Sequence, residues 1–275
     1  MSRVWFLTGC SSGIGWLLAQ RVLDEGDWVV ATARDPATLE SLSARGNARL
    51  LKLPLDVTRP DQVAATVARA YEHYGRLDVL VNNAGYGYFA PQEEADLVEV
   101  EGMFATNVFG LIRMTQAVLP IFREAQSGVV VNLSSMAGRI ATPRGGFYQA
   151  SKWAVEALSE ALSLEVANFG IRVVVIEPGR FDTRFSASAR PGPREQDAES
   201  PYAELRKRWT EAAQRLYPDL QDPREVVDAT WGAVAGNAPF VRVPVGRDSQ
   251  HVIEQRERLG ASGFVEWMRS RLDGR

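Results

Sequence analysis

Short apolar runs that alternate with longer stretches of helical periodicity constrain the fold of this chain more than any other feature. Runs that are apolar throughout are typical of parallel strands covered on both faces. The sequence therefore predicts an α/β, doubly wound fold with a seven-stranded parallel sheet, right-handed crossovers and helices on both faces. The expected strands cover 4–8, 28–33, 48–55, 77–83, 128–135, 171–178 and, more weakly, 240–244. The expected helices lie near 13–25, 36–44, 60–74, 96–124 with a break, 148–168, and in several stretches after 202.

We find no internal repeat, low-complexity tract or Gly/Ser-rich linker, so we interpret residues 1–275 as a single domain. The stretch at about 184–222 interrupts the alternation: it begins polar and Pro-containing and then turns amphipathic. Such an insertion between the sixth and seventh strands is expected to be a mobile segment that covers a substrate pocket.

Composition excludes several classes of function. A net charge of -3, without a block of like charges, argues against nucleic acid or an anionic membrane as a partner. One cysteine allows no internal disulfide, and two histidines leave no cluster with metal-ligand spacing, so we expect no metal. The first ten residues lack the pattern of a signal peptide, and no run is long enough to span a membrane. The expectation is a cytoplasmic protein that acts on a small molecule.

The first expected strand leads directly into the glycine-rich turn TGCSSGIG, residues 8–15, and a helical pattern follows. Gly9 permits a tight turn, Gly13 lets the backbone approach a phosphate, and Gly15 allows close packing of helix on strand. The N-terminus of the helix then offers free N–H groups to a pyrophosphate, and Ser11 and Ser12 add hydroxyl groups. The turn alone could also be a simple connection between strand and helix.

A tyrosine and a lysine stand four residues apart in YQASK, residues 148–152. The chain contains only three lysines against 28 arginines, so the choice of an ammonium at Lys152 is informative. On a helix, residues four apart share a face, so Lys152 can lie beside Tyr148.

Seven motifs occur in the order, and nearly at the intervals, of one enzyme family. They are TGCSSGIG, LDV at 55–57, NNAG at 82–85, Asn107, SS at 134–135, YQASK and PGRFDT at 178–183. The chain thus resembles the short-chain dehydrogenase/reductase family over residues 4 to about 183, and TGCSSGIG with ATARD resembles its hydroxysteroid/retinol dehydrogenase-like branch. The resemblance implies a Rossmann-type fold, a nicotinamide cofactor, and hydride transfer between an alcohol and a carbonyl.

The resemblance also implies a role for each catalytic residue. Tyr148 is the general acid/base, and Ser135 holds the substrate oxygen; Ser134 competes, but adjacent strand residues point to opposite faces. Asn107 would hold a water linked to Lys152, or would satisfy a helix irregularity, and both roles can hold. A free phenol has a pKa of about 10, so we expect Lys152 and the oxidised nicotinamide to lower the pKa of Tyr148 toward neutrality.

On the cofactor side, Asp56 and Val57 are expected to address the adenine, and NNAG to pass along the adenosine ribose, although Asn83 could chiefly brace the strands. Lys152 would also donate to the nicotinamide ribose, and PGRFDT would close over the carboxamide. The expected cofactor-binding residues are Gly9, Ser11, Ser12, Gly13, Ile14, Gly15, Arg34, Asp56, Val57, Asn83, Ala84, Gly85, Tyr148, Lys152, Pro178, Gly179, Phe181 and Thr183.

The end of the second strand, ATARDP, bears on the choice of dinucleotide. An acidic residue there normally takes the ribose hydroxyls of NAD, whereas a nearby arginine accommodates the phosphate of NADP. The family register puts Ala33 at the acidic position and Arg34 after it, and Asp35 before Pro36 suits a helix N-cap. The sequence therefore favours NADP(H), with Ser12 as a second phosphate partner, and leaves NAD(H) open.

Aromatic and apolar residues near the expected pocket mouth favour a hydrophobic ketone or secondary alcohol: Tyr86, Tyr88, Phe89, Met136, Ile140, Phe147 and Phe185. Arg180 and Arg184 leave a carboxylated or phosphorylated substrate open. The alternatives are a dinucleotide-binding sensor or scaffold without turnover, and a sugar-nucleotide epimerase or dehydratase. The family resemblance further implies a homodimer or homotetramer that associates through the helices near 103–124 and 148–168.

Overall fold

A single seven-stranded parallel sheet forms the centre of the computed structural model, which describes residues 2–45 and 48–274. The strand order is β3-β2-β1-β4-β6-β7-β9, so the doubly wound fold predicted from the sequence is confirmed. The predicted strand positions hold to within three residues at each end. The strands are β1 (Val4–Leu7), β2 (Trp28–Ala33), β3 (Leu50–Pro54), β4 (Val79–Asn82), β6 (Gly128–Leu133), β7 (Ile171–Pro178) and β9 (Phe240–Val245).

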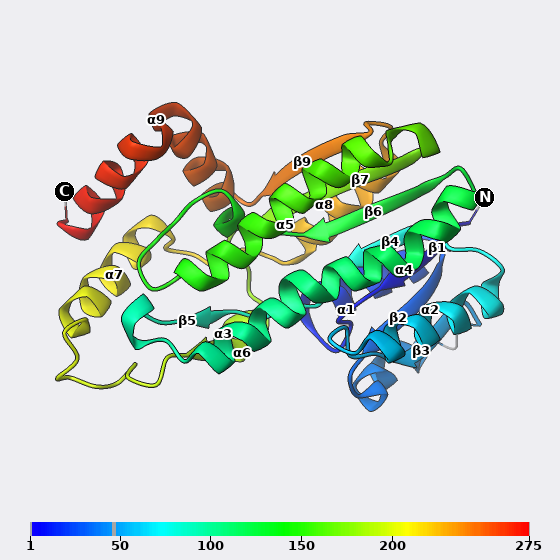
Figure 1. The fold of residues 1–275 in the computed structure, drawn as a ribbon, viewed down its shortest axis with the longest axis horizontal. Coiled ribbons are helices and arrows are strands. Elements are labelled where there is room, and N and C mark those ends of the chain that lie inside the picture. Colours follow the sequence, from blue (N-terminus) through cyan, green and yellow to red (C-terminus); the bar gives the residue numbers. More distant parts are fainter. Residues whose placement is uncertain (1, 46–47, 275) are drawn as a thin grey trace.

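Helices cover both faces of this sheet (Figure 1). On one face, α1 (Gly13–Asp24) and α8 (Arg224–Ala235) bury a core that includes Leu18 and Val226. On the other face, α2 (Pro60–Tyr74), α4 (Leu111–Glu124) and α5 (Gly146–Glu165) bury a second core that includes Val67 and Met114. The strand order reverses beside β1, and the carboxyl ends of β1 and β4 open there into the crevice where such folds bind ligands.

Two expected helices differ in detail from the prediction. The stretch at 36–44 is a 3-10 helix, η1 (Pro36–Arg45), and the Asp35 carboxylate accepts a hydrogen bond from the Ala37 N–H at 3.0 Å, as expected for a cap. The break predicted within 96–124 is a π-helix, η3 (Ala105–Gly110), between α3 (Leu97–Phe104) and α4. A π-helical turn inside an α-helix is often associated with a functional site.

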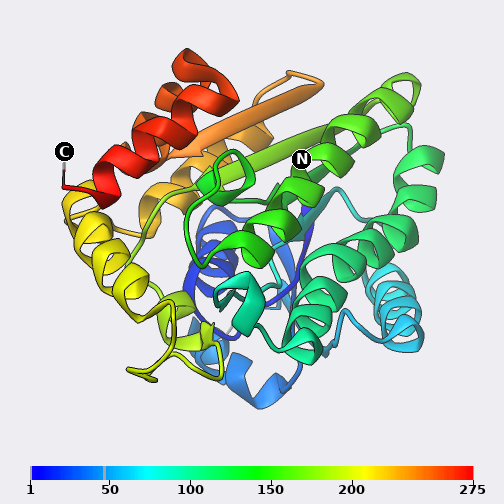
Figure 2. The ribbon, with the colours of Figure 1, turned by 60° about the vertical axis from the view of Figure 1, so that its left-hand side comes forward.

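The segment at 184–222 contains α6 (Phe185–Ser188), β8 (Arg190–Pro191) and α7 (Ala203–Leu216). A short parallel pair that the sequence did not reveal joins β8 to β5 (Tyr88–Phe89). The last helix, α9 (Arg247–Leu272), bends at Gly260, where φ is 66°. Beyond this bend α9 lies alongside α7, as Figure 2 shows. The remaining short helices are η2 (Gln92–Glu94), η4 (Met136–Gly138) and η5 (Ala167–Phe169).

Over residues 2–45 and 48–274, no helix combines the length and the apolar character that a membrane crossing requires.

Candidate active site

The glycine-rich turn between β1 and α1 adopts a backbone that needs glycine. Gly9 and Gly13 have φ of 71° and 60°, in the left-handed region. A Cβ on Gly15 would lie 2.4 Å from the Gly9 carbonyl oxygen and 2.5 Å from Asn83 Nδ2. Gly15 is therefore required because α1 lies against the turn itself. The prediction had been that Gly15 allows α1 to pack closely on the strand.

Side chains from β1 and from the end of β4 brace this turn. Asn83 Nδ2 donates to the carbonyl oxygens of Thr8 and Gly9, at 2.9 and 3.0 Å. Thr8 Oγ1 accepts from the backbone N–H groups of Asn83 and Ala84, both at 3.0 Å. Asn83 therefore braces the turn. The sequence had left open whether Asn83 contacts the cofactor or chiefly braces the strands. Thr8 was missed, although its place beside Gly9 at the end of an apolar strand is a readable signal.

The start of α1 presents unsatisfied donors toward the crevice. Its N-cap, Ser12, is extended, with φ of -169°, and its side chain makes no capping hydrogen bond. The first N–H groups of an α-helix have no partner within the helix, and they carry the positive end of the helix dipole. This arrangement suits an anion such as a phosphate.

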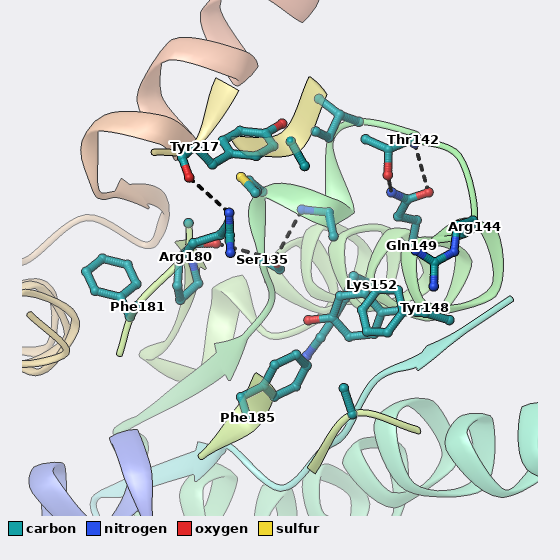
Figure 3. Close-up of a pocket in the computed structure, with 18 of the residues that line it drawn as sticks. Ser135, Thr142, Arg144, Tyr148, Gln149, Lys152, Arg180, Phe181, Phe185 and Tyr217 are labelled. Carbon is teal, nitrogen blue, oxygen red and sulfur yellow. Dashed lines mark hydrogen bonds between the residues drawn. The ribbon is translucent and has the colours of Figure 1, made fainter. Parts of the chain in front are cut away.

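Tyr148 and Lys152 lie together in one cavity of about 740 Å³ at the carboxyl ends of the central strands (Figure 3). Both lie on α5, and the Lys152 ammonium is 5.9 Å from the centroid of the Tyr148 ring. The ring lies between Phe89 and Phe185, with centroids at 5.4 and 5.6 Å. The predicted side-by-side placement of tyrosine and lysine is therefore present.

The ionisation expected for Tyr148 is not produced by the side chains of the chain. Burial raises the pKa of the Tyr148 phenol to about 12, and a hydrogen bond with Ser135 only partly opposes this shift. The Lys152 Nζ donates to the Leu133 carbonyl oxygen at 2.7 Å rather than to the phenol. In the chain alone, desolvation therefore keeps the pKa of Tyr148 high. The lowering predicted from Lys152 together with the oxidised nicotinamide stays a prediction.

Ser135 and Ser134 face different surroundings, as adjacent residues past the end of a strand should. Ser135 Oγ lies on the Tyr148 side, accepts from the Ala137 N–H at 3.1 Å and donates to the Pro178 carbonyl oxygen at 3.3 Å. Ser134 Oγ is buried without a partner, and a Cβ on Gly138 would lie 2.6 Å from it and 3.1 Å from Glu156 Oε1. Ser135 is thus the serine that faces the tyrosine.

Asn107 lies within the π-helix and is 3% exposed. Its amide accepts from the Tyr86 N–H at 3.0 Å and donates to the Tyr86 carbonyl oxygen at 2.9 Å and to Ser151 Oγ at 3.1 Å. The side chain thus fastens the loop between β4 and β5, at Tyr86, to α5. Its role as a brace at a helix irregularity has structural support, and its role in a proton relay stays a prediction.

The cavity gathers about half of the predicted cofactor residues. Asp56 lies elsewhere: its carboxylate accepts from the Thr58 N–H and hydroxyl, at 2.9 and 2.7 Å, at the start of the turn into α2. Arg34 is exposed after β2, and in the described part of the chain it has no hydrogen bond or ion pair. The lining set comprises Ile14, Asn83, Gly85, Tyr148, Lys152, Pro178, Gly179, Phe181 and Thr183; the others, Gly9, Ser11, Ser12, Gly13, Gly15, Arg34, Asp56, Val57 and Ala84, do not line it.

The turn after β7 is fixed by α9. Asp248 accepts from the Arg180 N–H and from Gln221 Nε2, both at 2.7 Å. A Cβ on Gly179 would lie 1.8 Å from Asp248 Oδ1, so only glycine fits there. Arg180 donates to the Tyr217 carbonyl oxygen at 3.0 Å, which ties the turn to the end of α7 (Figure 3). The PGRFDT turn is therefore held against the cavity from outside the first 183 residues.

The outer wall of the cavity comes from segments that sequence reasoning had not resolved. Of the aromatic and apolar candidates, Phe89, Met136, Ile140 and Phe185 line the cavity, whereas Tyr86, Tyr88 and Phe147 pack beside it. Arg180 lines it and Arg184 does not. Helical spacing could have indicated one common face for Trp209, Ala213 and Tyr217, but not that this face meets the cavity. The lining residues that were missed include Thr142, Arg144, Gln149, Trp209, Thr210, Ala213, Gln214 and Tyr217.

Comparison with known proteins places these features in a family. A family model described as short chain dehydrogenase matches residues 3–194. The chain belongs to the short-chain dehydrogenase family. Among the relatives of this dehydrogenase, Oxidoreductase BOA17 of Botryotinia fuckeliana is 35% identical, over 95% of this chain and 96% of its own. Estradiol 17-beta-dehydrogenase 1 of Rattus norvegicus is 37% identical, over 88% of this chain and 73% of its own, which supports the hydroxysteroid dehydrogenase-like branch.

Solved structures extend the match to the whole dehydrogenase fold. A short-chain dehydrogenase from Streptomyces avermitilis has a TM-score of 0.86 and 34% identity, with 98% of each chain covered. A short chain dehydrogenase from Burkholderia cenocepacia, in complex with NADP, has a TM-score of 0.74 and 26% identity, with 93% of each chain covered. One from Burkholderia phymatum, in complex with NAD, has a TM-score of 0.78 and 25% identity, with 94% and 92% covered. This chain is thus an oxidoreductase of a family whose structures hold NADP or NAD.

Proposed function

We propose that this dehydrogenase reduces a hydrophobic ketone, or oxidises the corresponding secondary alcohol, with a nicotinamide dinucleotide and with Tyr148 as the general acid/base. The observation that carries the proposal is the placement of Tyr148, Lys152 and Ser135 around one cavity that also reaches the glycine-rich turn. The cavity wall is mostly apolar, with Phe89, Met136, Ile140, Phe185 and Trp209 around a few polar groups, which suits a hydrophobic substrate.

The residues around the crevice fit a dinucleotide. The N-terminus of α1 and the two left-handed glycines offer backbone donors for the pyrophosphate. At the other end, Gly85 lies close to Asn107 and Lys152, because a Cβ there would lie 2.9 Å from Asn107 Oδ1 and 3.9 Å from Lys152 Nζ. Lys152 would hold the nicotinamide ribose, and Thr183 and the turn from Pro178 would hold the carboxamide. When bound, the dinucleotide supplies the hydride acceptor or donor.

The protein side of the reaction is acid/base chemistry at one oxygen. Tyr148 holds its proton at neutral pH because burial raises its pKa to about 12, so the chain favours the form that donates to a carbonyl oxygen. Ser135 Oγ faces the same phenol, and its O–H donates to the Pro178 carbonyl oxygen in the chain alone. On binding, this O–H would turn to the substrate oxygen and hold it in place. Alcohol oxidation needs the phenolate, and the Lys152 ammonium stabilises that form. Phe89 and Phe185 exclude water from the phenol.

We further propose a preference for NADP(H) over NAD(H). Arg34 is exposed after β2 and makes no hydrogen bond or ion pair in the described chain, so its guanidinium is available to a phosphate. Asp35, the nearest carboxylate, accepts from Ala37 and caps η1. No acidic side chain therefore stands ready at the end of β2 for a ribose hydroxyl pair.

The experiment is turnover of NADPH and NADH against a panel of hydrophobic ketones, with Tyr148→Phe as the matched variant. We expect NADPH-dependent reduction that the phenylalanine variant loses by about 10²–10⁴-fold, the range contributed by a positioned acid/base. Dinucleotide binding should persist in this variant. An unchanged rate would remove Tyr148 from the mechanism. Tight dinucleotide binding without turnover of any ketone or alcohol would favour the sensor or scaffold function instead.

Association through α4 and α5 is a further part of the proposal. Phe109, next to α4, and Leu164, on α5, are 52% and 77% exposed. Burial of such side chains against a second copy would stabilise an oligomer. Sedimentation of Leu164→Glu beside the unaltered protein tests this: we expect a dimer or tetramer that the glutamate weakens, and a monomeric unaltered protein would contradict it.

A further inference from the structure

A buried cluster of charged side chains lies next to Lys152, and the proposed mechanism does not use it. Glu156 lies one turn after Lys152 on α5 and is 5% exposed; Glu177, in β7, is fully buried. Three oxygens here are buried without a hydrogen-bond partner in the described chain: Glu156 Oε1, Glu177 Oε2 and Ser134 Oγ. Uncompensated buried carboxylate oxygens are costly, so their retention beside the active site calls for a role.

The two carboxylates share one guanidinium. Arg242 Nε, from β9, lies 2.9 Å from Glu156 Oε2 and 3.9 Å from Glu177 Oε1. Arg139, which follows η4, contacts Glu177 Oε1 at 3.0 Å. Glu156 and Glu177 are thus close enough to interact, and two like charges in a buried site favour the protonation of one of them.

The outer ends of both arginines are already neutralised. Arg242 also pairs with Glu160 at 2.6 Å, and Arg139 with Glu257 at 2.8 Å, and both of these glutamates are largely exposed. Burial and the neighbouring Glu156 charge raise the pKa of Glu177 to about 7. Near neutral pH Glu177 therefore holds a proton for part of the time, which limits the repulsion on Glu156. The charged groups that face Glu156 are Lys152 and Glu160 from α5, Arg139 after η4, Glu177 from β7 and Arg242 from β9, with Glu257 from α9 acting through Arg139.

We propose that Glu156 is a positioning residue for Lys152: its carboxylate, held by Arg242 and backed by Glu177, keeps the Lys152 amine in the ammonium form at neutral pH. The consequence for catalysis rests on the proposed function, whereas the charge state of Lys152 does not. Ser134, which the family pattern pairs with Ser135, lies near this cluster, since its Oγ and Glu156 Oε1 both flank Gly138.

The sign of the effect follows from burial. Desolvation lowers the pKa of Lys152 to about 8, and the Glu156 carboxylate opposes that shift. Without this carboxylate the pKa of Lys152 falls further, toward neutrality, and the ammonium is lost over the working range. Residues one turn apart on a helix are about 5–6 Å apart. At that spacing and an effective dielectric constant of about 20, one charge shifts a pKa by about one to two units.

The experiment is an NMR titration of the full chain labelled at lysine, which reads Lys152 directly because the chain has only three lysines. We expect Glu156→Gln to move the Lys152 midpoint to lower pH by about one unit. The matched control is Glu160→Gln. Glu160 is exposed, lies one turn further along α5 and pairs with the same Arg242, so this variant also removes one negative charge. It should leave the midpoint almost unchanged. Equal midpoints in Glu156→Gln and the unaltered protein would overturn the proposal.

A second variant and a second readout keep the test decisive. If Glu156→Gln does not fold, the double variant Glu156→Gln/Arg242→Gln removes carboxylate and guanidinium together. The midpoint should still fall, but by less than in Glu156→Gln, because the lost guanidinium had opposed the carboxylate. Glu156→Asp, which keeps the charge, should recover most of the shift. In turnover, the alkaline limb of the pH profile should move to lower pH in Glu156→Gln only. A shifted titration without turnover on any substrate would refute the proposed function and leave the electrostatic role standing.

Discussion

The turn at residues 8–15 and the segment at 184–222 bound the same cavity but are built in opposite ways. The turn is shaped by its backbone: left-handed glycines, a helix N-terminus and carbonyls braced by Thr8 and Asn83. The segment is held by side-chain charges: Arg206, 8% exposed, pairs with the buried Glu94 at 3.3 Å and donates to Ser200 Oγ at 3.0 Å. Arg144, in the loop before α5, pairs with Glu195. One region tolerates no added atom, and the other depends on partners distant in the sequence.

The largest expected effect is a loss of dinucleotide affinity when the turn at residues 8–15 is altered. Gly15→Ala places a Cβ 2.4 Å from the Gly9 carbonyl oxygen, so the turn must shift away from its binding geometry. We expect dinucleotide affinity to fall at least about 100-fold, measured by calorimetric titration. The matched control is Gly232→Ala in α8, whose Cβ meets no atom within 4 Å and should slightly stabilise the protein. Dinucleotide affinity that survives in Gly15→Ala would contradict this account of the turn.

The second prediction breaks the anchor of the 184–222 segment. Arg206→Ala removes the buried guanidinium and leaves Glu94 with Ser200 and the more exposed Arg194. The cost should therefore be smaller than the about 3–5 kcal/mol of a buried ion pair that loses its one partner. We expect lower thermal stability and a KM for the ketone raised at least about tenfold, with dinucleotide affinity within about twofold. Lys207→Ala, on the neighbouring exposed residue, should change neither. If dinucleotide affinity falls as much as ketone affinity, the two regions do not act separately.

The third prediction concerns the cofactor side alone. Arg34→Ser removes the exposed guanidinium after β2, and a lost charged hydrogen bond is worth about 1.5–3 kcal/mol. The ratio of kcat/KM for NADPH to that for NADH should fall at least about tenfold, in steady-state assays of both cofactors. The same substitution at the exposed Arg123, at the end of α4, should leave the ratio unchanged. An unchanged ratio in Arg34→Ser would mean that Arg34 makes no contact with the cofactor.

The smallest expected effect is a pH dependence of stability. The pKa of Glu177 is raised to about 7, so the folded protein binds more protons than the unfolded chain between about pH 4.5 and 7. Stability should therefore decline as pH rises through this window. In Glu177→Gln that decline should shrink, by a few degrees in melting temperature measured at pH 5 and pH 8. Parallel melting curves for the two proteins at both pH values would refute this role of Glu177.

The same contrast explains how much of the molecule the sequence predicted. All seven strands of the main sheet were placed, and Tyr148, Lys152 and Ser135 meet as expected, because alternation and helical spacing are local signals. The sequence could not reveal that burial raises the pKa of Tyr148 in the chain alone, since this burial depends on Phe89 and Phe185, which arrive from distant segments. The β5–β8 pair was missed for the same reason. The 184–222 segment was expected to cover a pocket, but its lining residues on α7 were not named. One signal in the sequence was not used: Glu177 is a carboxylate within an otherwise apolar strand, which indicates a buried charge.

Part of the cavity wall lies beyond the stretch that the family model matches. The match to the shared family model stops at residue 194, whereas Trp209, Ala213 and Tyr217 complete the wall, and α9 supports α7 through contacts from Arg208 to the Leu272 carbonyl and to Asp273. Mutations in this late part of the chain can reshape the chamber while the reactive centre on α5 and β6 stays intact. Related chains can thus accept different substrates while the reaction itself stays the same.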